Sequence, residues 1–170
     1  GKTGLLLLDP HEFSISQTTI DDDFDLNINT STNEVEITGH GITGTELGNP
    51  LRTNNVTIKA EKNINVNDTI EWSTATKLTL HAGNNIYINE QITAKHPDGK
   101  VALEYGQATP DGGTSGYYFK VDANKFVGKI NLENGPNFST KLGSDGNPIT
   151  YEVVDDSKTS NDPRSNSELN

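Results

Sequence analysis

Three side chains suited to general acid–base chemistry are expected on one outward-facing ladder. Lys59 and His81 stand at matching places in two copies of a repeat, and Glu61 is close to Lys59 in the sequence. An amine, an imidazole and a carboxylate in contact can exchange protons with a substrate. Solvated charges are nevertheless expected on the outer side of any repeat, and Arg52 is the only arginine before the C-terminal tail. We therefore expect no catalytic residues, with a polysaccharide-processing enzyme as the alternative.

The segment 39–44, GHGITG, matches the glycine pattern of dinucleotide-binding sites. That pattern needs a helix directly after it, so that the helix N-terminus faces the pyrophosphate. Gly48 and Pro50 should stop any helix here within two turns. We therefore expect a plain turn and no cofactor.

Alternating aspartates, Asp21, Asp23 and Asp25, resemble the start of an EF-hand loop. The loop also needs glycine at its sixth position and glutamate at its twelfth, where this chain has Leu26 and Thr32. An EF-hand is therefore rejected, and a looser Ca²⁺ site in this segment stays open.

Other metal and thiol chemistry is not indicated. His11, His40 and His96 lack the spacing of metal ligands. The chain has no cysteine, which excludes disulfides, thiolate catalysis and zinc–thiolate sites. We expect no bound metal.

A 22-residue repeat organises the middle of the chain. The segment KLTLHAGNNIYINEQITA (77–94) matches NVTIKAEKNINVNDTIEW (55–72) in its apolar positions, and Asn85 and Asn89 match Asn63 and Asn67. Each unit holds three short stretches with apolar residues at every second position, which indicates strands. This predicts an all-β fold, a right-handed parallel β-helix of three-sided coils stacked about 4.8 Å apart. Asn63 and Asn85 should then share side-chain amide hydrogen bonds. A β-sandwich is the alternative.

Later segments extend this pattern. KVALEYG (100–106) and GKINLENG (128–135) indicate further coils, and GQATPDGGTSGYYF between them indicates a lateral loop or hairpin excursion. Tyr105, Tyr117 and Tyr118 at the base of the loop either form a contact surface or cap the core. We assign residues 1–154 to the β-helical segment and residues 155–170 to a polar tail or linker, predicted to be disordered.

The charge and hydropathy of the chain indicate which classes of partner are disfavoured. The formal net charge is −11, from 13 basic and 24 acidic side chains, which disfavours nucleic acid and anionic membrane surfaces. LLLL at 5–8 is too short to cross a bilayer, so we expect no membrane insertion. The N-terminus lacks a signal-peptide layout, which indicates either an intracellular protein or an internal fragment whose export signal lies elsewhere.

A resemblance to a known family is carried by several segments, among them LLLLDPHEFSIS, NNVTIKAEKNINVNDTIEWST, KLTLHAGNNIYINEQITA and NFSTKLGSDGNPITYEVVD. These segments resemble filamentous-haemagglutinin-like exoproteins of Gram-negative two-partner secretion systems. The likeness is to their high-molecular-weight adhesins. It implies a long extracellular β-helical shaft that is exported through an outer-membrane transporter and binds a host-cell receptor or glycan. No counterpart of the family's secretion domain is visible. We therefore expect a non-catalytic segment of a secreted adhesin at the bacterial cell surface, with a passive spacer as the alternative.

Four asparagines stand in N-x-S/T motifs: Asn29, Asn55, Asn67 and Asn137. An Asn- and Thr-rich β protein contains several such motifs by chance. The resemblance implies hexose attachment at them. Asn55 and Asn67 are the better candidates, because turns and strand edges leave the side chain reachable.

Overall fold

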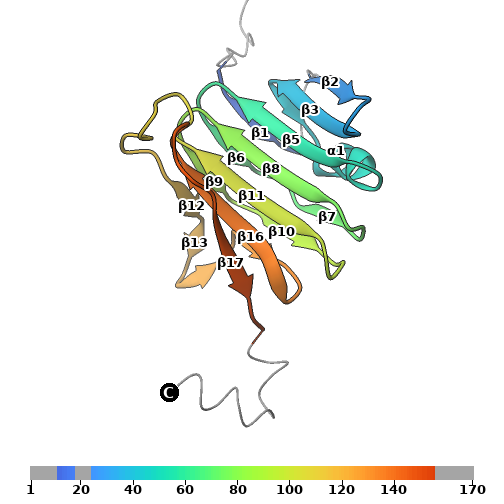
Figure 1. Ribbon diagram of the computed structural model, residues 1–170. Coiled ribbons are helices and arrows are strands. Elements are labelled where there is room, and N and C mark those ends of the chain that lie inside the picture. Colours follow the sequence, from blue (N-terminus) through green and yellow to red (C-terminus); the bar gives the residue numbers. More distant parts are fainter. Residues whose placement is uncertain (1–10, 18–23, 156–170) are drawn as a thin grey trace, which may run out of the picture.

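The computed structural model describes residues 11–17 and 24–155 and is dominated by strands (Figure 1). The prediction of an all-β chain is confirmed, apart from one helix among the described residues. Residues 5–8, Asp21, Asp23 and the tail beyond residue 155 lie outside the described residues. No helix within the described ranges is long and apolar enough to cross a membrane.

The largest sheet has seven strands in the order β17-β16-β11-β8-β5-β3-β2. Its central strands β3, β5, β8, β11 and β16 are parallel, and antiparallel hairpins, β2–β3 and β16–β17, close its two edges. The strands are β2 (Phe24–Asn29), β3 (Glu34–Gly39), β5 (Asn55–Ala60), β8 (Lys77–Ala82), β11 (Lys100–Tyr105), β16 (Gly135–Leu142) and β17 (Ile149–Val153).

Two smaller parallel sheets complete the stack, one of five strands in the order β12-β9-β6-β1-β4 and one of three in the order β15-β10-β7. A short antiparallel hairpin, β13–β14, leaves the stack between β12 and β15. The strands are β1 (Phe13–Ile15), β4 (Gly41–Ile42), β6 (Ile64–Val66), β9 (Ile86–Ile88), β12 (Tyr117–Phe119), β7 (Ile70–Trp72), β10 (Gln91–Ala94), β15 (Lys129–Asn131), β13 (Val121–Asp122) and β14 (Lys125–Phe126).

Strands at equivalent places in the two repeat units pair in the predicted register. Val56 lies beside Leu78 in the seven-stranded sheet, Ile64 beside Ile86 in the five-stranded sheet, and Ile70 beside Ile92 in the three-stranded sheet. In the next layer Leu78 lies beside Val101, so the pairing continues into the segment that follows the repeat. A β-sandwich does not account for parallel ladders of this kind.

The inward side chains of the three sheets form one core. Ile58, Leu80 and Leu103 succeed one another along the largest sheet, and each is fully buried. Burying such a side chain stabilises the fold by about 1.5–3 kcal/mol, an upper estimate because the unfolded chain is partly collapsed. The repeat therefore specifies a continuous hydrophobic core. Each successive strand of a sheet adds one layer of apolar side chains to it.

Asparagines at the turns join successive layers, but mostly by a different bond from the predicted one. Asn63 accepts a hydrogen bond at Oδ1 from the backbone N–H of Asn85 (3.0 Å), and Asn85 accepts from Gly116 N–H (2.9 Å). The predicted amide–amide bond between Asn63 and Asn85 is therefore wrong, because Asn63 Oδ1 accepts from the backbone and Asn85 Nδ2 donates to the hydroxyl of Tyr87 (3.2 Å). Asn89 does donate to the side chain of Asn67 (2.8 Å).

The segment 39–44, predicted as a plain turn, holds the end of β3, the short strand β4 and the start of the helix α1 (Gly44–Leu51), so the turn is only part of it. The helix has eight residues, within the two turns that Gly48 and Pro50 were expected to allow. Thr43 and Glu46 form a reciprocal capping box, which satisfies free N–H groups of the first turn. Leu47 and Leu51 are fully buried against the core. These gains outweigh the propensity cost of Pro50, which falls in the last turn.

Candidate functional site

A hollow of about 510 Å³ opens where β3, β5 and β8 end, beside the segment that precedes β1 and the loop that follows β11. We call it the polar hollow. Its size is within the range of small-molecule pockets. It is lined by residues from all five segments, among them His11, Glu36, Lys59, Glu61, His81 and Gln107.

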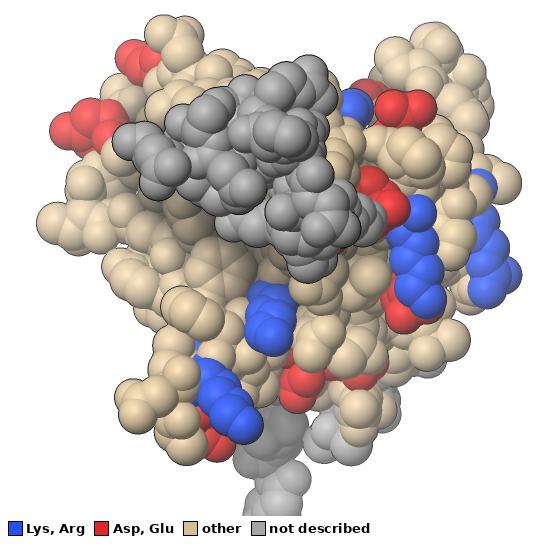
Figure 2. Space-filling view, turned by 90° about the horizontal axis from the view of Figure 1, so that it is seen from below, with Lys and Arg blue, Asp and Glu red and all other residues tan. Residues whose placement is uncertain are grey.

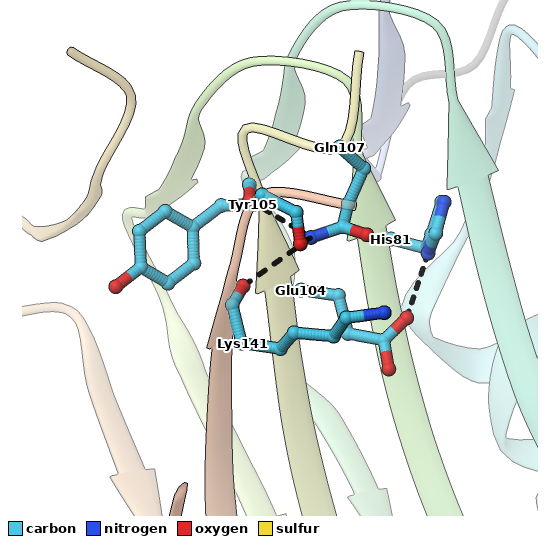
Figure 3. A network of polar contacts seen from close by, with 6 residues as sticks. His81, Glu104, Tyr105, Gln107 and Lys141 are labelled. Atoms are coloured by element: carbon cyan, nitrogen blue, oxygen red, sulfur yellow. Dashed lines mark hydrogen bonds and ion pairs between the residues drawn. The ribbon is translucent and has the colours of Figure 1, made fainter. Parts of the chain in front are cut away.

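A ladder of charged residues runs across the outer face of the largest sheet into this hollow. Lys59 pairs with His81, His81 with Glu104, and Glu104 with Lys141, one on each of four successive strands. His81 Nδ1 lies 2.7 Å from Glu104 Oε1, with about a quarter of each side chain exposed (Figure 3). The pKa of Glu104 is lowered, first by the hydrogen bond from His81, against a rise from burial, and further by nearby positive charges.

The three residues considered for acid–base chemistry are only partly brought together. Lys59 and His81 are neighbours on the ladder, as predicted. Glu61 instead bonds His11, while His81 bonds Glu104. Among the described carboxylates, none forms an ion pair with Lys59. The hollow is thus lined by the His11–Glu61 pair, by Lys59 and by His81, whose partner Glu104 is not a lining residue. The trio is not one proton-transfer group in this geometry.

Gln107 is clamped at the rim of the hollow. Its Nε2 donates to the carbonyl oxygens of Tyr105 (3.0 Å), Gly143 (3.0 Å) and, more weakly, Lys141 (3.4 Å) (Figure 3). Three carbonyl acceptors require the NH₂ end of the amide there, so the opposite atom, Oε1, is turned toward His81. The sequence carried no signal for this residue, because Lys141 and Gly143 belong to a distant part of the chain.

The predicted lateral loop is present after β11 and is tied down along its length. Ser144 N–H donates to Thr109 O (2.9 Å), and Asp145 N–H donates to Pro110 O (3.0 Å). Gly106 has a φ of +63°, and a Cβ there would lie 2.6 Å from Gly112 Cα. Only glycine meets both demands. The loop is therefore folded against the turn that follows β16.

The three tyrosines at the base of the loop take two different positions. Tyr117 occupies the register position above Ile86 and packs edge-on against Tyr105, with ring centroids 5.2 Å apart. Burial raises the pKa of both Tyr105 and Tyr117. Tyr118 faces outward, 50% exposed, and stacks on Tyr87 at 5.5 Å. None of the three lines the polar hollow.

Three of the four N-x-S/T asparagines are exposed. Asn29 is the last residue of β2, and its Oδ1 accepts from Ser31 N–H in the following turn (3.0 Å). Asn55 opens β5, and Asn67 directly follows β6. All three are reachable from solvent in the folded chain.

Asn137 is the exception, with 1% of its surface exposed. Its Nδ2 donates to the carbonyl oxygens of Pro97 and Glu133 (both 2.9 Å) and Asn134 (3.3 Å). Its Oδ1 accepts from Lys100 Nζ at 2.9 Å. This side chain joins two turns to the outer face of the largest sheet.

The N-terminus of α1, where a dinucleotide phosphate would sit, is occupied by a carboxylate. Asp68 Oδ2 accepts from Gly44 N–H at 2.8 Å and is buried. A Cβ at Gly44 would lie 1.9 Å from Thr69 O, so the glycine permits close packing of α1 rather than ligand approach.

Charged side chains were also compared for a second site among the described residues. The face seen in Figure 2 carries acidic and basic side chains scattered beside one another. In the described ranges, no three His, Asp or Glu side chains are grouped to hold a metal ion. Only Asp25 of the aspartate cluster falls within those ranges.

The chain was compared with protein-family models, curated proteins and solved structures, and none of them matches.

Proposed function

We propose that this chain is a non-catalytic segment of a large secreted bacterial surface adhesin, built as a right-handed parallel β-helix. The observation that carries the proposal is the parallel pairing of Val56 with Leu78, Ile64 with Ile86 and Ile70 with Ile92 in three different sheets. Parallel crossovers are right-handed in nearly all proteins, which supports the handedness. Coils stacked in this way extend into a rigid rod, since each coil buries the inner face of the next.

The loop after β11 supports a binding role in addition to a spacer role. Its backbone is bonded to the turn after β16, and Gln107 clamps its first residues. A surface that is ordered before binding loses little conformational entropy when a partner binds. Host-cell receptors or glycans are the partners we propose for this flank.

The composition of the chain is consistent with export from the cell, which the proposal requires. The chain has no cysteine, so no disulfide would obstruct passage of an unfolded chain through an outer-membrane transporter. The proposed location is the bacterial cell surface.

Binding of the fluorescently labelled chain to epithelial cells and to a glycan panel tests this function. A variant lacking residues 107–115 removes the loop, and a variant with a shortened β13–β14 hairpin serves as its control. We expect saturable binding that the loop deletion abolishes and the shortened hairpin preserves. A thermally unfolded sample measures the background. Absence of binding by both the folded chain and the control would reject the binding role and leave the spacer.

A further inference from the structure

The polar lining of the hollow combines hydrogen-bond acceptors with a lysine, a threonine hydroxyl and three histidines. Glu36 supplies a carboxylate, and Gln107 directs Oε1 toward His81 because three carbonyls hold its Nε2. Glu104 holds the Nδ1 side of the His81 ring, which leaves Nε2 as an acceptor when the imidazole is neutral. Lys59 is the complementary donor, and described carboxylates form ion pairs with His11, His81 and Lys95 instead.

Small residues form another part of the lining. Gly83 N–H donates to Ala60 O and Ala108 N–H donates to Gly83 O, both at 3.0 Å, so the three lie one behind another across successive layers. A Cβ at Gly83 would lie 1.8 Å from Glu61 O, which shows how closely the layers approach there. Ala108 is the exposed member of the three, so a ring can contact its methyl group with one face while the edge of the ring meets the polar groups.

We propose that the polar hollow binds an uncharged pyranose sugar, such as the terminal ring of a glycan. A hydroxyl group both donates and accepts, so a polyol satisfies the acceptors of Glu36, Gln107 and His81 and the donor of Lys59 together. An anionic group lacks the protons that these acceptors need, and an apolar ligand would leave them unpaired. The C–H face of the ring matches the exposed methyl group of Ala108. This inference rests on the proposed function and names the ligand class of that binding flank.

Imidazole signals in NMR spectra report on the hollow directly. The chain has four histidines. His11, His40 and His81 line the hollow, while His96 lies in the turn between β10 and β11 and serves as an internal reference. Titration with neutral methyl hexosides should shift the signals of the first three and leave His96 unchanged, with a dissociation constant of roughly 1–10 mM.

Two variants and a control locate the site. Lys59→Met removes the donor and should weaken binding about tenfold, whereas Lys141→Met, on the same ladder but outside the hollow, should leave it unchanged. Ala108→Leu fills the hollow from an exposed position and should abolish binding while the unfolding midpoint stays unchanged.

Three outcomes would overturn the inference: no shift with any neutral hexoside, equal shifts at all four histidines, or tighter binding of a hexuronate than of the matching hexose. The sugar site can be rejected without rejecting the proposed function. A chain that attaches to cells equally well with and without Ala108→Leu keeps the adhesin role and loses the sugar site.

Discussion

Lys100 Nζ lies 2.9 Å from the side-chain oxygen of Asn137, a hydrogen bond between β11 and β16 on the outer face of the largest sheet. The lysine holds the oxygen end of an amide whose nitrogen end bonds three backbone carbonyls. A residue that looks like a modification site in the sequence is thus a buried structural clamp.

Replacing Asn137 with alanine should destabilise the fold by about 2–4 kcal/mol, because three backbone carbonyls and Lys100 lose a buried hydrogen-bonding partner. Urea unfolding followed by circular dichroism measures the change in the free energy of unfolding. Asn55→Ala, at an exposed motif of the same type, is the control and should cost about 1 kcal/mol or less, since its Oδ1 accepts a single bond from Lys77 N–H. Equal losses in the two variants would contradict the clamp.

Hexose attachment to the folded chain should reach Asn29, Asn55 and Asn67 and should spare Asn137. The first three residues are exposed, whereas the fourth is buried and the Nδ2 that would carry the sugar is hydrogen-bonded. Peptide mass spectrometry after treatment with a sequon-specific hexosyltransferase gives the occupancy of each site. Modification of Asn137 at the level of the others would show that its turn opens readily.

Acid should weaken the fold partly through Glu104. Its pKa is lower in the folded chain than in the unfolded chain, so the folded state binds fewer protons in the acid range. The stabilisation is therefore complete above the unfolded carboxyl pKa of about 4.3 and is lost as pH falls through the folded value. Glu104→Gln should flatten the fall in unfolding free energy between neutral pH and about pH 3, measured by urea titration at each pH. Glu152→Gln, on exposed β17, is the control.

The two adjacent tyrosines should separate stability from binding. Tyr117→Ala removes a ring packed against the core and should cost about 2–3 kcal/mol, less than a fully buried aromatic residue. Tyr118→Ala removes an exposed ring stacked on Tyr87 and should cost under about 1 kcal/mol. If the tyrosines contribute to attachment, Tyr118→Ala is the variant that should reduce cell binding while it stays folded. Thermal unfolding and the cell-binding measurement, run on the same samples, distinguish the two effects.

The capping box predicts a modest role for Thr43. Thr43→Ala should lower stability by about 1 kcal/mol, because Glu46 N–H loses its acceptor. Thr43→Ser keeps the hydroxyl and should restore most of the stability. An unchanged unfolding midpoint in Thr43→Ala would mean that α1 is held by Leu47 and Leu51 alone.

The register of the strands was readable from the sequence because it depends on local repetition. Apolar residues at every second position, copied in the next repeat unit, place Ile64 beside Ile86 with no knowledge of distant contacts. The lateral loop was readable for a similar reason, since clustered glycine, proline and aspartate do not extend a strand.

The polar hollow, the clamp at Asn137 and the helix α1 were decided by tertiary structure. Gln107 meets Gly143 and Lys100 meets Asn137 across long stretches of chain, and nothing in the local sequence marks either pair. In α1, burial of Leu47 against the core overrides the weak helix propensity of a segment with glycine and proline. Local patterns specify which face of a strand is buried. Which polar groups then meet outside the core depends on how the layers are stacked, and that is a property of the folded chain alone.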